Sequence, residues 1–447
     1  MKPQRSAGAA GTTPHRVHLV NPPSAPGTTA NREGAAGLGM VYPTPEAFLY
    51  PPHTLAVAAA SLRDAGFQVR AFDGVVSALP PDLGLADAIA VFVSWASLGT
   101  DVAFIAELRA QTSARLLAFG PAMRFVGQDV LDRSAVDAVL VGEAEGFMHT
   151  AIQALLDGSA ANSPQLVSPQ AVQAHGYDGQ GLIEDLDRLF FPAWELLPHT
   201  RYPLLTVLSS RGCPDLCTYC PYAAAQGRHF RTRSVPNILA ELTLLQQRFQ
   251  PARLVFRDPV FAHQRERVVE LCTAVLDARL SLNWECESRP EHFDRELLTL
   301  MQRAGCRWVK VGLETTDATL LQRLKRVTSA EQAEQYLQHT AAVVSTCREI
   351  GLRCRLFVMA GLPGQDASMA AHTAALVKRM QPDALNVKLC EPYPGTGLPA
   401  ATGDHAGQMA ILLQAQRHVQ SQVQSGRPSL LQRGKGWLRR VLKDRET

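Results

Sequence analysis

The segment RGCPDLCTYCP, residues 211–221, holds three cysteines, Cys213, Cys217 and Cys220, in the spacing C-x3-C-x2-C. It directly follows the strand-like run Leu204–Ser209, so we expect the cysteines on a loop at the carboxyl end of a strand. Iron–sulfur clusters are held by Cys thiolates that lie close together in sequence. We therefore predict a [4Fe–4S] cluster bound by these three cysteines, with its fourth iron open to another ligand.

A zinc site or a chance grouping accounts for the cysteines less well. A structural zinc site has four protein ligands, and here no second cysteine pair or adjacent histidine completes one, His229 being the nearest. Three unrelated buried cysteines would not give such dense spacing beside Gly212 and Pro214. The iron–sulfur interpretation is therefore preferred.

Six strand–helix units make up the region around this segment, residues 200–395. The expected strands are Leu204–Ser209, Arg253–Arg257, Leu282–Glu285, Trp308–Leu313, Arg353–Met359 and Ala384–Leu389, and the expected helices include Val235–Phe249, Arg265–Ala278, Asp294–Ala304 and Ala330–Ile350. This series predicts a partial (β/α)6 TIM-type barrel, in which the loops at the carboxyl ends of the strands carry the chemistry. The cysteines follow the first of these strands.

Residues 16–156 show an earlier βαβ alternation, which predicts an α/β domain with a doubly wound, Rossmann-like parallel sheet. Its strand and helix candidates are Val17–Val20, Leu55–Ala65, Gln68–Phe72, Ala88–Val93, Val102–Ala110, Arg115–Phe119 and Ala138–Val141. Small and polar residues follow the strands at Asn21-Pro22-Pro23, Ser94-Trp95, Gly120-Pro121 and Gly142-Glu143-Ala144-Glu145. Ligands of such sheets bind at the carboxyl ends of the strands, so we expect a binding crevice there.

The remaining segments are expected to be less regular. Residues 1–15 are expected to be disordered, and residues 157–199, which begin with a Ser-, Asn-, Gln-, Pro- and Gly-rich stretch, are expected to form a linker. Residues 396–447 are expected to form a helical extension after the barrel. Within it, residues 400–428 are polar and irregular, and Leu430–Arg445 is a basic amphipathic segment that we expect to pack on the barrel.

Composition narrows the class of protein. The chain has 447 residues and a formal net charge of +3, which is too small to indicate a nucleic-acid binder. Residues 1–16 lack the apolar stretch of a signal peptide, and no run of 18 apolar residues predicts a transmembrane segment. Nine cysteines without such a signal favour reduced thiols or metal ligands over disulfides. We therefore expect a cytoplasmic protein.

The cysteine spacing after the first barrel strand, with Tyr219 before the third cysteine, resembles the radical S-adenosylmethionine (SAM) superfamily. The resemblance covers roughly residues 200–395. It implies that the cluster cleaves SAM reductively to a 5′-deoxyadenosyl radical, with electrons from an external reductant of the flavodoxin or ferredoxin type. It also implies SAM contacts from residues at the strand ends, namely Tyr219, Asp258, Arg289, Gly312, Glu314 and Gly361. Candidates for a general acid or base are Tyr222, Arg257, Glu287, Glu391 and Tyr393.

The amino-terminal domain, in this order before the barrel, resembles the cobalamin-binding domain of the cobalamin-dependent, class B methyltransferase-like branch of that superfamily. The implied cobalamin contacts are Ser94, Gly120, Gly142 and Glu143. Two features depart from the pattern. The D-x-H-x-x-G signature that supplies a histidine to cobalt in mutases is absent, which suits methyl transfer. Pro121 stands where the branch has a second glycine, which removes a backbone donor and leaves open an empty domain.

These observations predict a cobalamin-dependent radical enzyme that methylates a carbon of a small metabolite. One alternative keeps the radical but uses no cobalamin, and carries out a dehydration, deoxygenation or rearrangement. Another is a corrinoid-binding protein without catalytic activity. Methylthiotransferases share the cysteine spacing but carry additional amino-terminal cysteines, and in this chain no cysteine precedes Cys213.

Overall fold

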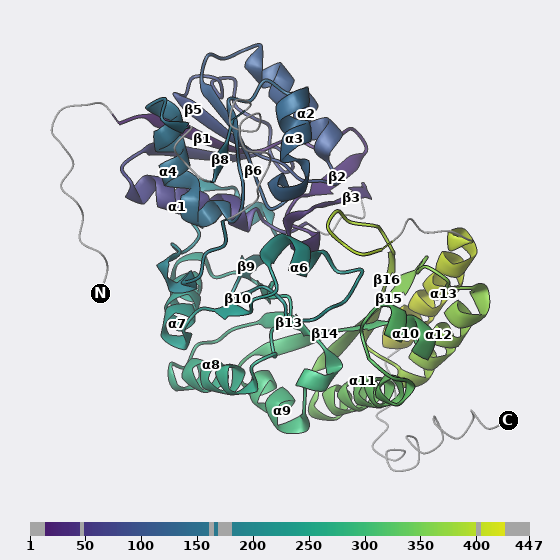
Figure 1. Ribbon diagram of the computed structural model, residues 1–447. Coiled ribbons are helices and arrows are strands. Elements are labelled where there is room, and N and C mark those ends of the chain that lie inside the picture. Colours follow the sequence, from purple (N-terminus) through teal and green to yellow (C-terminus); the bar gives the residue numbers. More distant parts are fainter. Residues whose placement is uncertain (1–13, 45–48, 161–164, 169–180, 399–403, 425–447) are drawn as a thin grey trace. The chain divides into compact units, whose positions relative to one another are not determined.

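The computed structural model describes residues 14–44, 49–160, 165–168, 181–398 and 404–424 (Figure 1). The chain forms two compact units. The first extends to Ile183 and includes Arg188–Tyr202, and the second consists of Glu184–Asp187 and the chain from Pro203 onward. Residues 188–199, which were expected in a linker, thus belong to the first unit.

The first unit is built on a six-stranded sheet with the strand order β4-β1-β5-β6-β7-β8. Its strands are β1 (Arg16–Asn21), β4 (Gln68–Asp73), β5 (Ala88–Phe92), β6 (Arg115–Phe119), β7 (Ala138–Leu140) and β8 (Leu166–Val167). Its helices are α1 (His53–Asp64), α2 (Leu98–Arg109), α3 (Met123–Arg133) and α4 (Ala144–Leu156). Figure 1 shows α1 and α4 on one face of the sheet and α2 and α3 on the other. This arrangement confirms the predicted doubly wound α/β fold.

Burial explains why the central strands are apolar throughout. A parallel sheet covered by helices on both faces has no solvent side, so its strands are continuously hydrophobic. All five residues of β5, AIAVF, are buried. The strand β4 is added on one side of β1 and the next strands, from β5 onward, on the other side, so the strand order reverses at β1. The space between the carboxyl ends of β1 and β5 is therefore the switch point where such sheets bind ligands.

Several elements of this unit were not expected from the sequence. Between β1 and α1 the chain forms an antiparallel pair, β2 (Thr28–Asn31) and β3 (Met40–Pro43), joined through the 3-10 turn η1 (Ala35–Gly37). The predicted linker supplies β8, which pairs antiparallel with β7. Three further 3-10 turns follow, η3 (Leu186–Arg188), which straddles the boundary between the units, η4 (Trp194–Leu196) and η5 (His199–Arg201).

The second unit is a six-stranded parallel sheet with the order β16-β15-β14-β13-β12-β9. Its strands are β9 (Leu205–Val207), β12 (Leu254–Phe256), β13 (Trp284–Ser288), β14 (Cys306–Glu314), β15 (Arg353–Ala360) and β16 (Ala384–Leu389). Its helices are α6 (Pro221–Gln226), α7 (Val235–Leu244), α8 (Arg265–Asp277), α9 (Arg295–Arg303), α10 (Ala318–Arg323), α11 (Ala330–Ile350), α12 (Ala367–Met380) and α13 (His405–Gln424), with a π-turn η6 (Leu245–Phe249) and a 3-10 turn η7 (Pro290–His292). All six predicted strands are present, in the order of a partial barrel.

Side-chain caps fix where several barrel helices begin. Asp294, Asp317 and Asp366 each accept a hydrogen bond from a backbone N–H in the first turn of α9, α10 and α12. Such caps stabilise a helix by about 1 kcal/mol each. They also explain why a turn directly precedes each of these helices.

The segment after the barrel differs from the expectation. Residues 400–428 were expected to be irregular, but residues 405–424 form the helix α13. Leu412, Ala415 and Val419 recur at helical spacing and are buried, so a narrow apolar stripe is enough to hold an otherwise polar helix. The predicted helix Leu430–Arg445 and the expected disorder of residues 1–13 lie outside the described residues.

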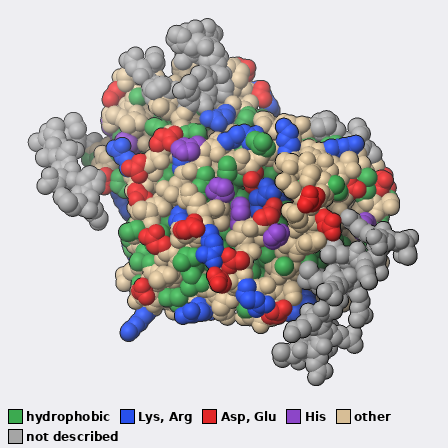
Figure 2. All heavy atoms as spheres, turned by 60° about the horizontal axis from the view of Figure 1, so that its bottom comes forward, with side chains coloured by type: hydrophobic (Ala, Val, Ile, Leu, Met, Phe, Trp, Pro, Cys, Tyr) green, Lys and Arg blue, Asp and Glu red, His purple; other side chains and the backbone are tan. Residues whose placement is uncertain are grey.

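The surface shown in Figure 2 carries Lys and Arg side chains interspersed with Asp and Glu, in agreement with the small net charge. Among the helices that the structure describes, none combines the length and apolar character that a membrane span requires.

Candidate active site

A short antiparallel ladder closes the neck of the cysteine segment. The strands β10 (Ser210–Arg211) and β11 (Arg231–Thr232) pair on either side of it, and the Cys213 N–H donates to the Gly227 carbonyl. Gly212 lies at this neck with a φ of +79°, and a Cβ there would lie 2.0 Å from the carbonyl oxygen of His229. Glycine is therefore required directly before the first cysteine.

The three cysteines lie near one another in a mainly buried setting. Cys213 and Cys217 are buried and Cys220 is partly so. Burial, helped by the charge of Asp215, raises the pKa of the Cys213 thiol to about 12, and burial raises the pKa of Cys220 well above its usual value. Such thiols stay protonated by themselves, but a coordinated metal deprotonates a thiol outright. The donor set thus suits a strongly Lewis-acidic metal centre.

The three cysteines could bind either a cluster or a single metal ion. Within the described ranges, no three His, Cys, Asp or Glu side chains converge as ligands of one metal ion must. In a cubane each thiolate binds a different iron, so the three sulfurs stand farther apart than ligands around one zinc. The described residues thus give no support to the zinc alternative, and a [4Fe–4S] cluster on Cys213, Cys217 and Cys220 stays a prediction.

Three other strand ends hold the cysteine segment in place. Arg289, after β13, forms an ion pair with Asp215 at 3.2 Å and donates to the Arg326 carbonyl at 2.8 Å. The Thr218 N–H donates to the carbonyl of Leu324, at the end of α10. The carbonyl of Thr218 accepts from Gly397, in the segment after β16. The structure thus brings the ends of β13, β14 and β16 to the cysteines, as a barrel-mouth site requires.

Arg289 has a positioning role in these contacts. Its guanidinium is shared between Asp215, the Arg326 carbonyl and Glu291, which it contacts at 2.7 Å. Desolvation acts against the charged form, but these acidic partners outweigh it and raise the pKa of Arg289 above its usual value. The prediction that Arg289 contacts SAM remains a prediction.

Tyr219 and Glu314 meet beside the cysteines. The ring of Tyr219 packs on an apolar cluster formed by Leu320, Leu324, Met359, Leu362 and Cys390. Burial raises the pKa of Glu314, and the charge of Arg326 and the hydrogen bond from Tyr219 oppose that rise. Glu314 also has a φ of +61°, which few non-glycine residues adopt, so the end of β14 is strained where its carboxylate is placed.

Arg326 is a site residue that was not expected from the sequence. Its side chain is buried, donates to the Sγ of Cys217 at 3.7 Å and to the Gly312 carbonyl at 3.0 Å, and contacts the hydroxyl of Tyr336 at 3.0 Å. A Cβ on Gly312 would lie 2.2 Å from Glu314 Oε1 and 3.1 Å from Arg326 Nη2. Gly312 therefore leaves room for both charged side chains.

Asp258 is engaged within the chain. Its two carboxylate oxygens accept hydrogen bonds from the Ser209 N–H at 2.8 Å and from the hydroxyls of Ser209 and Ser210. The carboxylate also forms an ion pair with Arg267 at 3.7 Å. These bonds tie the end of β12 to the strand that leads into the cysteines. The preceding Arg257 is also buried. The structure thus gives Asp258 a positioning role, and a contact from Asp258 to SAM remains a prediction.

The other predicted residues lie at strand ends without forming one catalytic group. Gly361 has a φ of +77°, and its N–H donates to Gln408 on α13. The backbone N–H of Tyr222 hydrogen-bonds toward Cys220. Glu287 and Glu391 are exposed, and the carbonyl of Tyr393 accepts from Thr396. The roles proposed for Tyr222, Arg257, Glu287, Glu391 and Tyr393 as acid or base remain untested.

In the first unit the predicted cobalamin residues lie at the carboxyl edge of the sheet. Ser94 and Glu143 are buried, and Glu143 accepts from the Ile183 N–H at 2.7 Å. Gly120 has a φ of +133° and Gly142 a φ of +98°, and a Cβ on either would lie within 2.6 Å of a backbone carbonyl. Both glycines are thus required by the local backbone, whatever the edge binds.

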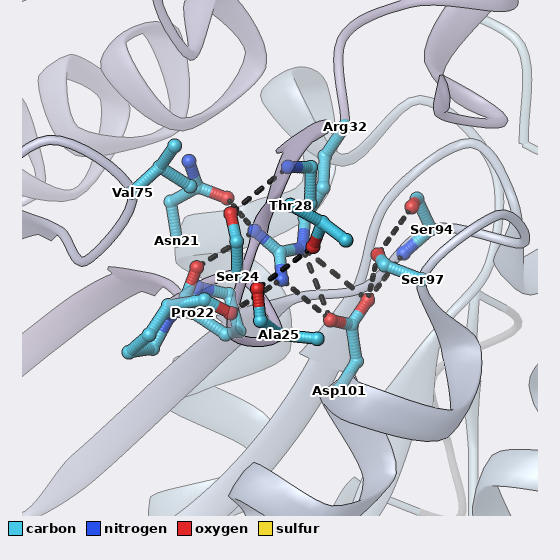
Figure 3. A network of polar contacts seen from close by, with 12 residues as sticks. Asn21, Pro22, Ser24, Ala25, Thr28, Arg32, Val75, Ser94, Ser97 and Asp101 are labelled. Atoms are coloured by element: carbon cyan, nitrogen blue, oxygen red, sulfur yellow. Dashed lines mark hydrogen bonds and ion pairs between the residues drawn. The ribbon is translucent and has the colours of Figure 1, made fainter. Parts of the chain in front are cut away.

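A buried arginine spans the switch point of this sheet (Figure 3). Arg32, from the loop after β2, donates to Asp101 Oδ1 at 2.6 Å, to Asn21 Oδ1 at 3.0 Å and to the Pro22 carbonyl at 2.7 Å. Asp101 also accepts from the Ser94 N–H and from Ser97. The pair is almost completely buried, with side chains 1% and 0% exposed. It joins the ends of β1 and β5, where the sequence had predicted a ligand crevice.

No sequence signal distinguished Arg32, Asp101 or Arg326 from surface charges. Each lies in a loop or helix among other polar residues, and its burial results from contacts with distant segments, since Arg32 and Asp101 are 69 positions apart. The cysteines could be proposed as ligands because their spacing is local in the sequence.

The described fold defines a two-unit protein in which a doubly wound domain precedes a partial barrel whose first strand leads into a loop with three cysteines. Residues 207–377 match the family profile of the radical SAM superfamily. This match covers most of the barrel and agrees with the resemblance to that superfamily predicted from the sequence.

Known proteins are similar to this chain in sequence or in fold. An uncharacterized methyltransferase of Pyrococcus horikoshii is 24% identical, over 59% of this chain and 57% of its own length. The hopanoid C-3 methylase of Methylococcus capsulatus is 25% identical, over 77% of this chain and 67% of its own length. The radical SAM methyltransferase TsrM of Kitasatospora setae, solved with cobalamin and a [4Fe–4S] cluster bound, superposes with a TM-score of 0.66 at 18% identity, over 86% of this chain and 74% of TsrM. This last likeness shows the shared fold.

Proposed function

We propose that this chain is a cobalamin-dependent radical SAM enzyme that methylates a carbon atom of a small molecule. The observation that carries the proposal is the cysteine trio, held at the mouth of a partial barrel that follows a doubly wound domain. TsrM, solved with cobalamin and a [4Fe–4S] cluster bound, superposes over 86% of this chain, and relatives of the chain are named as a methyltransferase and a methylase. We also propose an external reductant of the flavodoxin or ferredoxin type.

When bound, the cluster would supply the electron that cleaves SAM, and cobalamin would carry the methyl group. The chain's own residues hold and orient these groups. Cys213, Cys217 and Cys220 would ligate three irons, and Arg326 places a positive charge beside Cys217. Tyr219 and Glu314 close the site on the side of β14, and the apolar residues behind Tyr219 exclude water from it.

One observation favours a second candidate, a cobalamin-independent dehydration or rearrangement. Pro121 follows Gly120 at the edge where cobalamin would bind, and its ring packs against Gly37, where a Cβ would lie only 2.4 Å from Pro121 Cγ. Pro121 has no N–H to offer a ligand. In this alternative the first unit keeps its fold and binds no corrinoid.

The test is a product balance on the full chain after anaerobic reconstitution with iron, sulfide and hydroxocobalamin, followed by reduction in the presence of SAM. Methylation predicts retained corrinoid in the ultraviolet–visible spectrum, together with 5′-deoxyadenosine and S-adenosylhomocysteine. Deoxyadenosine without S-adenosylhomocysteine or bound corrinoid would support the second candidate. A cluster whose spectrum does not respond to SAM would exclude both.

A matched pair of variants controls this experiment. Cys217→Ala removes a predicted iron ligand and should reduce SAM cleavage to background. Cys272→Ala removes a cysteine that is also buried, but in the core between α8 and the sheet, and should leave SAM cleavage in place. Equal losses in both variants would contradict the assignment of the cluster ligands.

A further inference from the structure

Each strand of the barrel directs alternate side chains toward the outer helices and toward the barrel interior. Cys286, Val309, Val311, Cys354 and Leu356 are fully buried on the helix side. Since side chains alternate along a strand, their neighbours point to the opposite, inner face. Figure 1 shows the helices α8, α9 and α11 on the outer side of these strands. The inner-face residues on β13, β14 and β15 are Glu285, Glu287, Trp308, Lys310, Arg353, Arg355 and Phe357.

Strand register places two positive charges side by side on this inner face. Lys310 pairs with Glu287 on one side and with Arg355 on the other. Like charges directly opposite each other on neighbouring strands are destabilising. The positive charge of Lys310 is compensated by an ion pair, because its Nζ lies 2.7 Å from Glu285 Oε1. Glu285 also faces Arg253 at 3.8 Å.

Arg355 has no such compensation. Among the described residues, its Nε is buried and has no hydrogen-bond partner, and its guanidinium stacks on the ring of Trp308 at 5.0 Å. Arg353 stacks on the same ring at 5.4 Å and adds a second positive charge there. Arg355 is half-buried, and a buried N–H without an acceptor is costly, so this side chain is arranged for an acceptor that the chain itself does not supply.

Lys388 approaches the same region from β16. It pairs in register with Met359, and its Nζ lies over the ring of Phe357 at 4.9 Å. Phe357 lies two residues beyond Arg355 on the same face of β15, so Lys388 and Arg355 both reach this face of the sheet. Met359, the register partner of Lys388, is nearer the carboxyl end of β15 than Arg355, so Lys388 lies on the cysteine-loop side of Arg355.

We propose that Arg355 and Lys388, with the rings of Trp308 and Phe357, bind an anionic group of the substrate, either a carboxylate or a phosphate. The proposal rests on the proposed function, because the inner face of the barrel beneath the cysteine loop is where a substrate of the SAM-derived radical would bind. The planar fork of Arg355 can take either anion in a bidentate manner, and Lys388 adds a point charge. An uncharged substrate would leave Arg355 unpaired, so this cationic–aromatic wall selects for an acidic small molecule.

The test uses the full chain, reconstituted with its cluster and labelled with 5-fluorotryptophan, with the Trp308 resonance assigned from the variant Trp308→Phe. Inorganic phosphate and succinate are titrated separately at constant ionic strength, and the 19F shift of Trp308 is followed. A saturable shift is expected with at least one anion, and the anion with the lower Kd identifies the preferred group. In Arg355→Gln the Kd should rise at least about tenfold, and Lys388→Gln should also weaken binding.

Control variants keep this test decisive. Arg379→Gln removes the same charge from an exposed position on α12 and should leave the Kd unchanged. Arg355→Lys, which keeps the charge but not the bidentate geometry, should give an intermediate Kd and guards against misfolding of Arg355→Gln. The proposal is overturned if neither anion gives a saturable shift, or if Arg355→Gln and Arg379→Gln have the same effect. Competition by S-adenosylhomocysteine would also overturn it, because the anion site would then belong to the cofactor.

The test of this inference and the test of the proposed function can fail separately. Anion binding is measured without turnover, whereas the proposed function is tested by SAM cleavage. Loss of anion binding with intact SAM cleavage would remove the inference alone, and anion binding without SAM cleavage would remove the proposed function alone.

Discussion

We expect the buried carboxyl group of Asp73 to make the stability of the first unit depend on pH. It ends β4 and is almost fully buried, with hydrogen bonds from the Asn21 side chain at 2.9 Å, from the Val75 N–H at 2.9 Å and from the Tyr202 hydroxyl. Burial raises its pKa to about 6, and the Val75 and Asn21 hydrogen bonds reduce that rise. The charged form is therefore disfavoured in the folded protein.

The sign of the pH effect follows from this raised pKa. Between the unfolded value of 3.8 and the folded value of about 6, the folded state binds the proton more tightly than the unfolded state does. The contribution of Asp73 to stability is therefore highest below pH 4 and falls as the pH rises through 6, by about 3 kcal/mol in total. Asp73→Asn should remove this loss. In urea titrations the unfolding free energy of the variant minus that of the wild type should therefore increase from pH 4 to pH 7.

A surface carboxylate provides the comparison. Asp129 is exposed on α3, and Asp129→Asn should not show the same growth with pH. An equal difference in unfolding free energy between Asp73→Asn and wild type at pH 4 and pH 7 would contradict a raised pKa of Asp73.

At the scale of single residues, the sequence predicted what is local. Cys213, Cys217 and Cys220 were assigned because a chelating set lies within one short segment. The burial of Arg326 and Arg32 could not be predicted, because it depends on partners that come from other strands and helices. The same holds for Arg355, whose isolation depends on strand register.

At the scale of elements, the neck formed by β10 and β11 determines the shape of the cysteine loop. A ladder of two residue pairs is weak by itself, so the close approach of Gly212 to the His229 backbone must be kept for the loop to hold its shape. Gly212→Ala should cost more than the about 1–2 kcal/mol that a left-handed alanine costs, because its Cβ meets a backbone carbonyl. We expect a lower iron content per chain after reconstitution, measured by colorimetric iron analysis.

Gly351 supplies the matched control for that prediction. It ends α11 with a φ of +76°, close to that of Gly212, but a Cβ there would meet nothing within 4 Å. Gly351→Ala should therefore show the conformational cost alone and keep its iron. Full iron loading in Gly212→Ala would show that the neck does not shape the cluster site.

Element prediction succeeded where hydrophobic periodicity was strong and failed where contacts decide the structure. The barrel strands were predicted because apolar runs recur between amphipathic helices. The β2–β3 pair, the edge strand β8 and the β10–β11 ladder are short, so tertiary hydrogen bonds form them rather than propensity. Helix α13 was missed because its polar residues outnumber the narrow stripe that packs.

At the scale of the whole molecule, two units with separate cores would carry separate cofactors. The first has its own doubly wound sheet and the second its own barrel sheet, and the proposed cobalamin and cluster residues lie in different units. A domain with its own hydrophobic core can fold alone. Loss of one cofactor should therefore leave the binding of the other intact.

Two reciprocal variants test this independence. Replacing Cys213, Cys217 and Cys220 together by Ala should abolish iron binding but leave the Kd for hydroxocobalamin unchanged. Gly120→Ala, whose Cβ would lie 2.6 Å from the Val93 carbonyl, should weaken corrinoid binding and leave the iron content unchanged. Iron analysis and corrinoid absorbance after gel filtration measure both quantities on each variant. Loss of both cofactors in either variant would show that the two sites are coupled, and unchanged corrinoid binding in Gly120→Ala would show that this edge of the sheet is not where the corrinoid binds.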